Sequence, residues 1–105
     1  MRVTIAHSKT KAEAVHAVDC AMQDVFQSLA MPPLTISNPQ KTWNGSVMTF
    51  SLTAQIGFLK NAISGTVEVT ERDVTIDADL GLLNRFFPEK TIRTMVESRV
   101  RGLLT

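Results

Sequence analysis

The residue types that most often perform chemistry are sparse in this 105-residue chain, which has two histidines and one cysteine. His16 and Cys20 stand four positions apart, the spacing of neighbours on one helix face. A zinc site needs three or four ligands, and no further His or Cys stands at ligand spacing. A nucleophilic Cys20 would need an activating base, which His16 could in principle supply. We favour an ordinary helix-face pair, and we place His7 at a strand end.

Carboxylates form the second candidate group. Asp77 and Asp79 share one strand face, and Glu68 is expected across from them. Such groups can hold a cation or run acid–base chemistry, but a wet sheet face without an enclosing loop favours simple solvation. The five glycines are all isolated, so the sequence has no phosphate-binding loop. We therefore predict no catalytic residues, no metal site and no cofactor.

Large apolar side chains in predicted loops are harder to assign. One interpretation is that they plug the end of the fold between the sheet and the final helix. The other is an exposed patch for a partner, a lipid or a hydrophobic polymer surface, rimmed by Lys60 and Arg85. The arginines of the final helix offer a further surface for a partner. The candidate apolar contact patch comprises Phe58, Leu59, Leu82, Leu83, Phe86 and Phe87.

Two helices are predicted from apolar residues that recur in steps of three and four. The first begins near Lys11, because Thr10 and Glu13 have the spacing of a capping box, and it ends before Pro32-Pro33. The second begins at Pro88, where the missing N–H is no loss. The apolar stripes are Ala14, Val15, Val18, Ala21, Met22, Val25, Phe26 and Leu29, then Ile92, Met95, Val96, Val100, Leu103 and Leu104.

Alternation of apolar and polar residues predicts five strands. Asn44-Gly45 indicates a type I′ hairpin turn, and Pro39 interrupts the second strand or confines it to a sheet edge. Gly65 takes an inward position, where we expect a helix to approach the sheet closely. The predicted strands lie in residues 2–6, 34–37, 48–56, 63–70 and 74–80.

Outward positions on the last three strands are almost all Thr, Ser, Gln, Asp or Glu. One face of the sheet is therefore wet, and both helices must cover the other face. The sequence predicts a two-layer α+β sandwich of order β-α-β-β-β-β-α with a mainly antiparallel sheet. At this length, residues 1–105 are expected to form a single domain.

Composition and charge restrict the function classes. Hydrophobic residues make up 44% and charged residues 20%, as in ordinary folded proteins. A net charge of +1, one Trp and no Tyr argue against a nucleic-acid partner. A single cysteine suits a reducing compartment, and neither a signal peptide nor an integral membrane segment is evident. We expect a cytoplasmic protein.

Several segments together carry a family resemblance. They are residues 65–69 and 74–80, Leu80-Gly81-Leu82-Leu83, the ending Gly102-Leu103-Leu104, and an N-terminal strand, His7-Ser8 and alanine-rich helix. These segments resemble the small bacterial polyhydroxyalkanoic acid system proteins, which are encoded in polyhydroxyalkanoate granule regions. The resemblance implies a cytoplasmic accessory protein linked to carbon-storage granules, and it carries over no catalytic residue. The chain departs from the family in Pro32-Pro33, in Trp43 and in a less charged central hairpin.

Two functions from different classes follow. The first is a non-enzymatic accessory protein that contacts the granule surface, a granule-coating protein or the polymerase through the apolar patch. The alternative is a carrier of an acyl or other apolar ligand, held in a cavity between the sheet and the final helix. Small inward residues (Ala54, Gly65, Ala78) would favour that cavity. An enzyme ranks last, and homodimerisation through an edge strand or the apolar residues near position 85 is a further expectation.

Overall fold

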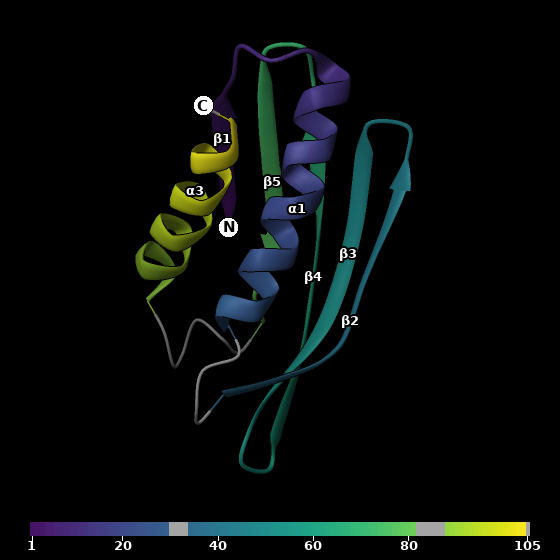
Figure 1. Cartoon of the computed structure of the whole chain (residues 1–105). Coiled ribbons are helices and arrows are strands. Elements are labelled where there is room, and N and C mark those ends of the chain that lie inside the picture. The colour runs from purple at the N-terminus through teal and green to yellow at the C-terminus, as the bar shows by residue number, and fades with distance from the viewer. Residues whose placement is uncertain (30–33, 82–87, 105) are drawn as a thin grey trace.

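The protein is a five-stranded antiparallel sheet with two helices on one face (Figure 1). The computed structural model describes residues 1–29, 34–81 and 88–104. The strands stand in the order β1-β5-β4-β3-β2, so β1 and β2 form the two edges. This arrangement confirms the predicted α+β fold, the order of its elements and the placement of both helices on one face. The elements are β1 (Arg2–Ala6), α1 (Lys11–Leu29), β2 (Leu34–Asn44), β3 (Val47–Ile56), β4 (Leu59–Val69), β5 (Asp73–Asp79) and α3 (Glu89–Leu104).

Helix α1 begins with the predicted capping box. The Glu13 N–H donates to Thr10 Oγ1 at 3.2 Å, and the Thr10 N–H donates to Glu13 Oε1 at 3.2 Å. These two bonds satisfy backbone donors that a helix start otherwise leaves without partners. The apolar stripe faces the sheet, and its central residues Val18, Met22 and Val25 are buried.

The sheet buries its inner face against both helices. Phe50 on β3 pairs across the sheet with Gly65 on β4, and the Phe50 ring fills the space where a Gly65 side chain would stand. The atoms nearest to that position belong to the two neighbouring strands: the Phe50 ring of β3 and the backbone of Asp77 and Ala78 on β5. The same ring lies 5.8 Å from the Phe26 ring of α1, which links the two layers.

Two tight turns join β2 to β3 and β3 to β4. The central residues of the first are Gly45 and Ser46, since Asn44 pairs with Val47. Gly45 has a φ of 64° and Ser46 has no positive φ, which matches a type II′ turn and not the predicted type I′. In the second turn Gly57 has a φ of 60° and is followed by Phe58. Glycine is required at both first positions because other residues disfavour this conformation.

Strand β2 is longer than predicted, because a β-bulge carries it past Pro39. Ser37 pairs with Thr53 and Gln40 with Ser51, so two residues of β2 oppose one of β3. Asn38 takes a φ of 50° within this bulge, a conformation that Asn tolerates better than most residues. Pro39 is accommodated because β2 is an edge strand, one of the two outcomes predicted for it.

Helix α3 crosses beside α1 and completes the covering layer (Figure 1). The Pro88 carbonyl accepts hydrogen bonds from the Thr91 and Ile92 N–H groups, so Pro88 is the N-cap residue, one position before the first helical residue that was predicted for it. Leu103, expected on the buried side, remains 41% exposed. The molecule is elongated along the strands, with extents of 43 × 25 × 18 Å. The residues of α3 that are buried are Ile92, Val96, Val100 and Leu104.

Candidate functional site

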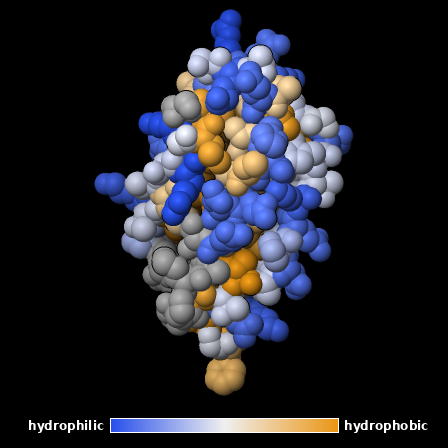
Figure 2. Space-filling view, in the orientation of Figure 1, coloured by the Kyte–Doolittle hydropathy of each residue, from blue (hydrophilic) through white to orange (hydrophobic). Residues whose placement is uncertain are grey.

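The tip of the β3–β4 hairpin presents two large apolar side chains to solvent. Phe58 is fully exposed and Leu59 is 53% exposed. The Gln55 Nε2 donates to the Gly57 carbonyl at 2.9 Å, which holds the turn in shape. Figure 1 places this turn at the far end of the longest arm of the sheet, and Figure 2 shows an apolar group projecting there. Phe58 and Leu59 therefore face solvent and do not plug the end of the core.

The other four residues of the predicted patch (Leu82, Leu83, Phe86 and Phe87), with Arg85, lie outside the described residues. The structure does show where the chain leaves the sheet before them. The Leu80 carbonyl accepts a hydrogen bond of 2.9 Å from Asn61 Nδ2, and Gly81 follows with a φ of 54°. Asn61 stands two residues after Leu59, so this exit point lies on the same hairpin arm as the apolar tip.

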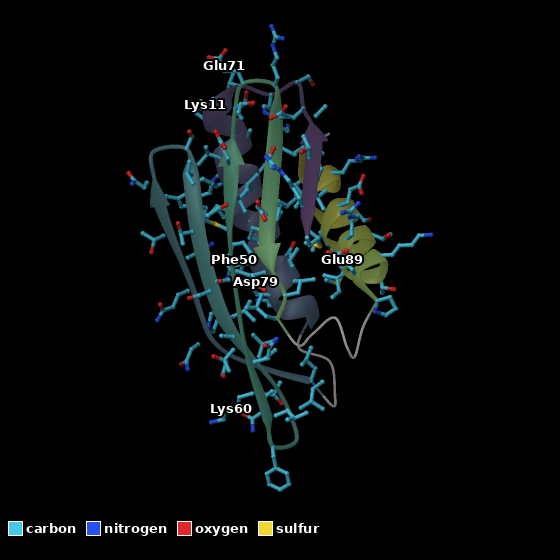
Figure 3. All side chains as sticks on the ribbon, turned by 180° about the vertical axis from the view of Figure 1, so that it is seen from behind. Lys11, Phe50, Lys60, Glu71, Asp79 and Glu89 are labelled. Carbon is cyan, nitrogen blue, oxygen red and sulfur yellow. The ribbon has the colours of Figure 1, made fainter. Side chains whose placement is uncertain are left out.

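Lys60 supplies positive charge beside the tip, as expected for a rim. It is exposed and pairs across the hairpin with Gln55. Figure 3 places Lys60 near the turn, well away from Glu71 at the opposite end of the sheet. The tip therefore combines an apolar end with one described cation.

Behind the tip, the uncovered face of the sheet carries a field of hydroxyl side chains. No described element covers this face, which is turned toward the viewer in Figure 3. The cross-strand register aligns Thr42, Thr49 and Thr66 in one row and Gln40, Ser51 and Ser64 in the next. We name the following exposed or half-buried residues the hydroxyl face: Thr35, Ser37, Thr42, Thr49, Ser51, Thr53, Ser64 and Thr66.

Charges border the hydroxyl face without entering it. Lys60 and Glu68 stand at opposite ends of its β4 side. On the neighbouring β5, Asp77 and Asp79 are the direct cross-strand partners of Thr66 and Ser64. Glu68 pairs with Thr75 and not with either aspartate, so the predicted carboxylate group is spread along the sheet. Asp79 Oδ1 accepts the Gly81 N–H at 3.0 Å, a local turn contact.

The histidines and the cysteine lie apart from the hairpin tip. Cys20 Sγ lies 3.9 Å from His16 Nε2 on the exposed side of α1, one helical turn away. His7 Nδ1 accepts the Lys9 N–H at 3.2 Å, so Nε2 carries the proton that bonds to the Thr70 carbonyl at 2.8 Å. Across the described parts of the chain, no three His, Cys, Asp or Glu side chains gather closely enough to hold a metal ion.

One polar cluster was not anticipated from the sequence. Asp19 of α1 lies 2.9 Å from Lys41 Nζ and accepts a 2.9 Å hydrogen bond from Trp43 Nε1, both on β2. The hydrogen bond from Lys41, followed by that from Trp43, lowers the pKa of the Asp19 carboxyl below its ordinary value. This Asp19 clamp fastens the edge strand to the helix. The sequence did contain a signal for this cluster. Inward apolar residues of β2 stand at even positions in Leu34 and Ile36 but at an odd position in Trp43, and such a change of alternation within one strand requires a bulge.

The interior offers little space for a ligand. Among the described residues, the cavity between the sheet and both helices measures about 30 Å³ and has apolar walls that include Phe26, Phe50 and Val96. Drug-sized ligands occupy pockets of roughly 300–1,000 Å³. Gly65 leaves no room either, because the Phe50 ring occupies its side-chain position. The carrier hypothesis therefore receives no support from the described core.

The final helix gives a mixed surface. Arg101 Nη2 lies 2.7 Å from Glu97 Oε1, so this arginine pairs with its own helix. Arg99 and Leu103 line a shallow groove between α1 and α3 together with Asp24. The groove carries both signs of charge and therefore indicates no particular partner.

Taken together, the fold and its surfaces define a small α+β protein with an apolar hairpin tip and a hydroxyl-rich area on the uncovered sheet face. The chain belongs to the family described as "putative polyhydroxyalkanoic acid system protein", whose family model matches residues 1–104. No curated protein matches the chain. Neither described helix has a stretch of sufficient length and hydrophobicity to span a lipid bilayer.

Proposed function

We propose that this protein is a non-enzymatic accessory protein that attaches to polyhydroxyalkanoate granules in the cytoplasm through the apolar tip Phe58-Leu59. The family relationship supports the polyhydroxyalkanoate context. The granule surface itself, or a protein that coats it, is the partner of this proposal.

The observation that carries the proposal is the complete exposure of Phe58 at the end of a rigid hairpin. Exposure of a phenylalanine ring to water is unfavourable, and covering the ring with a binding partner lowers the free energy. Fully burying such a side chain contributes about 1.5–3 kcal/mol. The turn is already ordered by Gly57 and the Gln55 hydrogen bond, so binding loses little further conformational freedom there.

A binding role is also supported by how the reactive side chains are used. The pKa of Glu13 is lowered by its hydrogen bonds from Thr10, and that of Asp19 by those from Lys41 and Trp43. Perturbed pKa values can mark catalytic sites. Here one of the two carboxyls caps a helix and the other fastens a strand, so each shift has a structural cause.

Cosedimentation with isolated polyhydroxyalkanoate granules tests the proposal. We expect wild-type protein to sediment with granules and Phe58→Ser to bind about ten- to hundredfold more weakly, as the loss of one buried ring predicts. Phe58→Leu should retain most of the binding because it keeps an apolar side chain in the turn. Since Phe58 packs against nothing in the described core, all variants should keep the wild-type melting temperature.

Leu103→Ser serves as the matched control, because it removes an exposed large apolar side chain from the helical side of the molecule. Its binding should equal that of the wild type. Equal binding by Phe58→Ser and wild type would contradict the assignment of the tip. No sedimentation of wild-type protein with native granules would contradict the proposed function as a whole.

A further inference from the structure

We propose that the hydroxyl face is a second contact surface, which recognises the ester carbonyl groups of the polymer. This inference rests on the proposed function and names the chemistry that the granule would present. A polymer of hydroxyalkanoic acids is a polyester, with one carbonyl acceptor and one alkyl chain in every repeat and no hydrogen-bond donor along its length. The face that fits such a surface carries donors and methyl groups and no charge.

Side-chain chemistry on the hydroxyl face meets these requirements. Each threonine offers an O–H donor and a methyl group from the same Cβ. None of the eight hydroxyls is bonded to another described residue, so all are available to an outside acceptor. By contrast, the Thr4 and Thr75 hydroxyls on the β1–β5 side lie 3.3 Å apart and bond to each other.

This area is largely uncharged. Within the rows of β2, β3 and β4 from Thr35 to Thr66, Lys60 at the tip is the single charged residue on this face among those described. Charge begins on the next strand, β5, where Asp77 pairs with Thr66 and Asp79 pairs with Ser64. A charged side chain pressed against a neutral polyester would lose its hydration without gaining an opposite charge, and this desolvation raises the free energy of binding. An uncharged surface avoids that cost, whereas a site for an acidic or basic partner would carry the opposite charge.

Regular spacing suits an extended partner. Neighbouring residues within a row, such as Thr49 and Thr66, have Cβ atoms about 4.5–5.5 Å apart. Successive rows, such as those of Thr49 and Ser51, follow at roughly 6.8 Å along a strand. The donors thus form a two-dimensional array, which can bond to many acceptors of a polymer surface at once.

The hydroxyl face is continuous with the apolar tip. Thr53 pairs with Ala62 and Gln55 pairs with Lys60 on the way to the turn that bears Phe58. Both surfaces therefore share strands β3 and β4. A molecule lying on a polymer surface can use the two together, with the ring at the end and the hydroxyls along the arm.

The alternative explanation is that threonine serves only as a good strand former on a solvated face. Replacing threonine by valine separates the two explanations, because valine has the same shape and β-branching but no hydroxyl. If apolar adsorption were the whole basis of binding, added valine would strengthen it. If the hydroxyls bond to esters, the same change weakens binding to a polyester.

The test uses Thr49→Val/Thr66→Val, a cross-strand pair in the row of the hydroxyl face that lies farthest from the tip. Thr91→Val/Thr94→Val, at exposed positions of α3 on the opposite side of the molecule, is the matched control. Binding is measured to protein-free particles of poly(3-hydroxybutyrate) and to polystyrene particles of equal size. Circular dichroism and melting curves establish that both variants fold.

We expect the sheet variant to bind the polyester about tenfold more weakly than wild type, since two hydrogen bonds are lost. Its binding to polystyrene should be unchanged or stronger, and the helix variant should match wild type on the polyester. Unchanged or stronger polyester binding by the sheet variant would overturn the inference and leave the proposed function standing. Binding of wild type to native granules but not to bare polyester would also overturn it, because a coat protein would then be the partner.

Discussion

At the scale of single residues, Asp19 shows how one carboxylate can order a sheet edge. Its Oδ1 atom lies 2.9 Å from Lys41 Nζ and 2.9 Å from Trp43 Nε1, and Lys41 also donates to the Asp19 backbone carbonyl at 3.1 Å. The side chains are only partly buried, so solvent weakens the ion pair. The main effect of the Asp19 clamp is therefore geometric: it holds the Lys41 and Trp43 side chains of β2 toward α1.

Asp19→Asn should make stability less dependent on pH. The pKa of Asp19 is lowered in the folded state, so the ionised carboxylate stabilises the protein fully above its unfolded pKa. That contribution is lost as the pH falls below the ordinary value of 3.8 and through the lowered folded value. Urea unfolding at pH 7 should show wild type about 1 kcal/mol more stable than the variant, and the gap should close near pH 2.

Asp24→Asn is the control for that experiment, because it removes an exposed carboxylate from the same helix. Its stability difference from wild type should stay near zero at both pH values. A gap between wild type and Asp19→Asn that persists unchanged at pH 2 would show that the charge of Asp19 is not the cause.

At the scale of elements, the bulge in β2 decides which way its second half faces. Leu34 and Ile36 point toward the helices, and an unbroken strand would next send Asn38 and then Gln40 inward. The extra residue reverses the alternation, so Lys41 and Trp43 turn toward α1 and meet Asp19. The bulge is thus the condition for the clamp.

Deleting Asn38 should remove the bulge and leave the clamp in place. Pro39 would then oppose Leu52 alone, so Trp43 keeps its pairing with Met48 and its inward direction. Trp43 is the single tryptophan of the chain, so its fluorescence reports its surroundings directly. We expect the wild-type emission maximum from the deletion variant and from Asn38→Gly, and a red-shifted maximum in the deletion variant would contradict this account of the bulge.

The same bulge bears on self-association. An edge strand offers unpaired backbone groups to a second molecule, and bulges, prolines and inward-pointing lysines discourage such pairing. Strand β2 has Pro39 within the bulge and Lys41 turned inward. Dimerisation through this edge, which was one expectation from the sequence, is disfavoured by these features.

Local rules were sufficient to predict most elements. The capping box, the apolar stripe and the alternation on β3 each repeat a signal over several residues, so single exceptions do not hide them. The second half of β2 was missed because its alternation changes phase at Asn38-Pro39, and a phase change resembles the end of a strand. The turn type was also wrong, because it depends on which two residues lie between the paired strands.

At the scale of the whole molecule, the candidate surfaces were predicted unevenly. Phe58 and Leu59 could be recognised because two large apolar residues beside a turn glycine have few places to be buried. Alternation showed that Thr49 and Thr66 face outward, but it could not show that they stand side by side. That alignment depends on the register between strands, which only the assembled sheet defines.

The elongated shape has a consequence for how densely the protein can cover a surface. A molecule standing on its hairpin tip would occupy an area of about 25 × 18 Å, whereas one lying on the sheet would occupy about 43 × 25 Å. The lying orientation, which joint use of tip and hydroxyl face requires, therefore allows less than half the number of molecules per unit area. A quartz microbalance coated with poly(3-hydroxybutyrate) measures this directly, and we expect saturation at the lower density. Thr49→Val/Thr66→Val, which retains the tip but weakens the face, should saturate at a higher density as molecules rise from the surface.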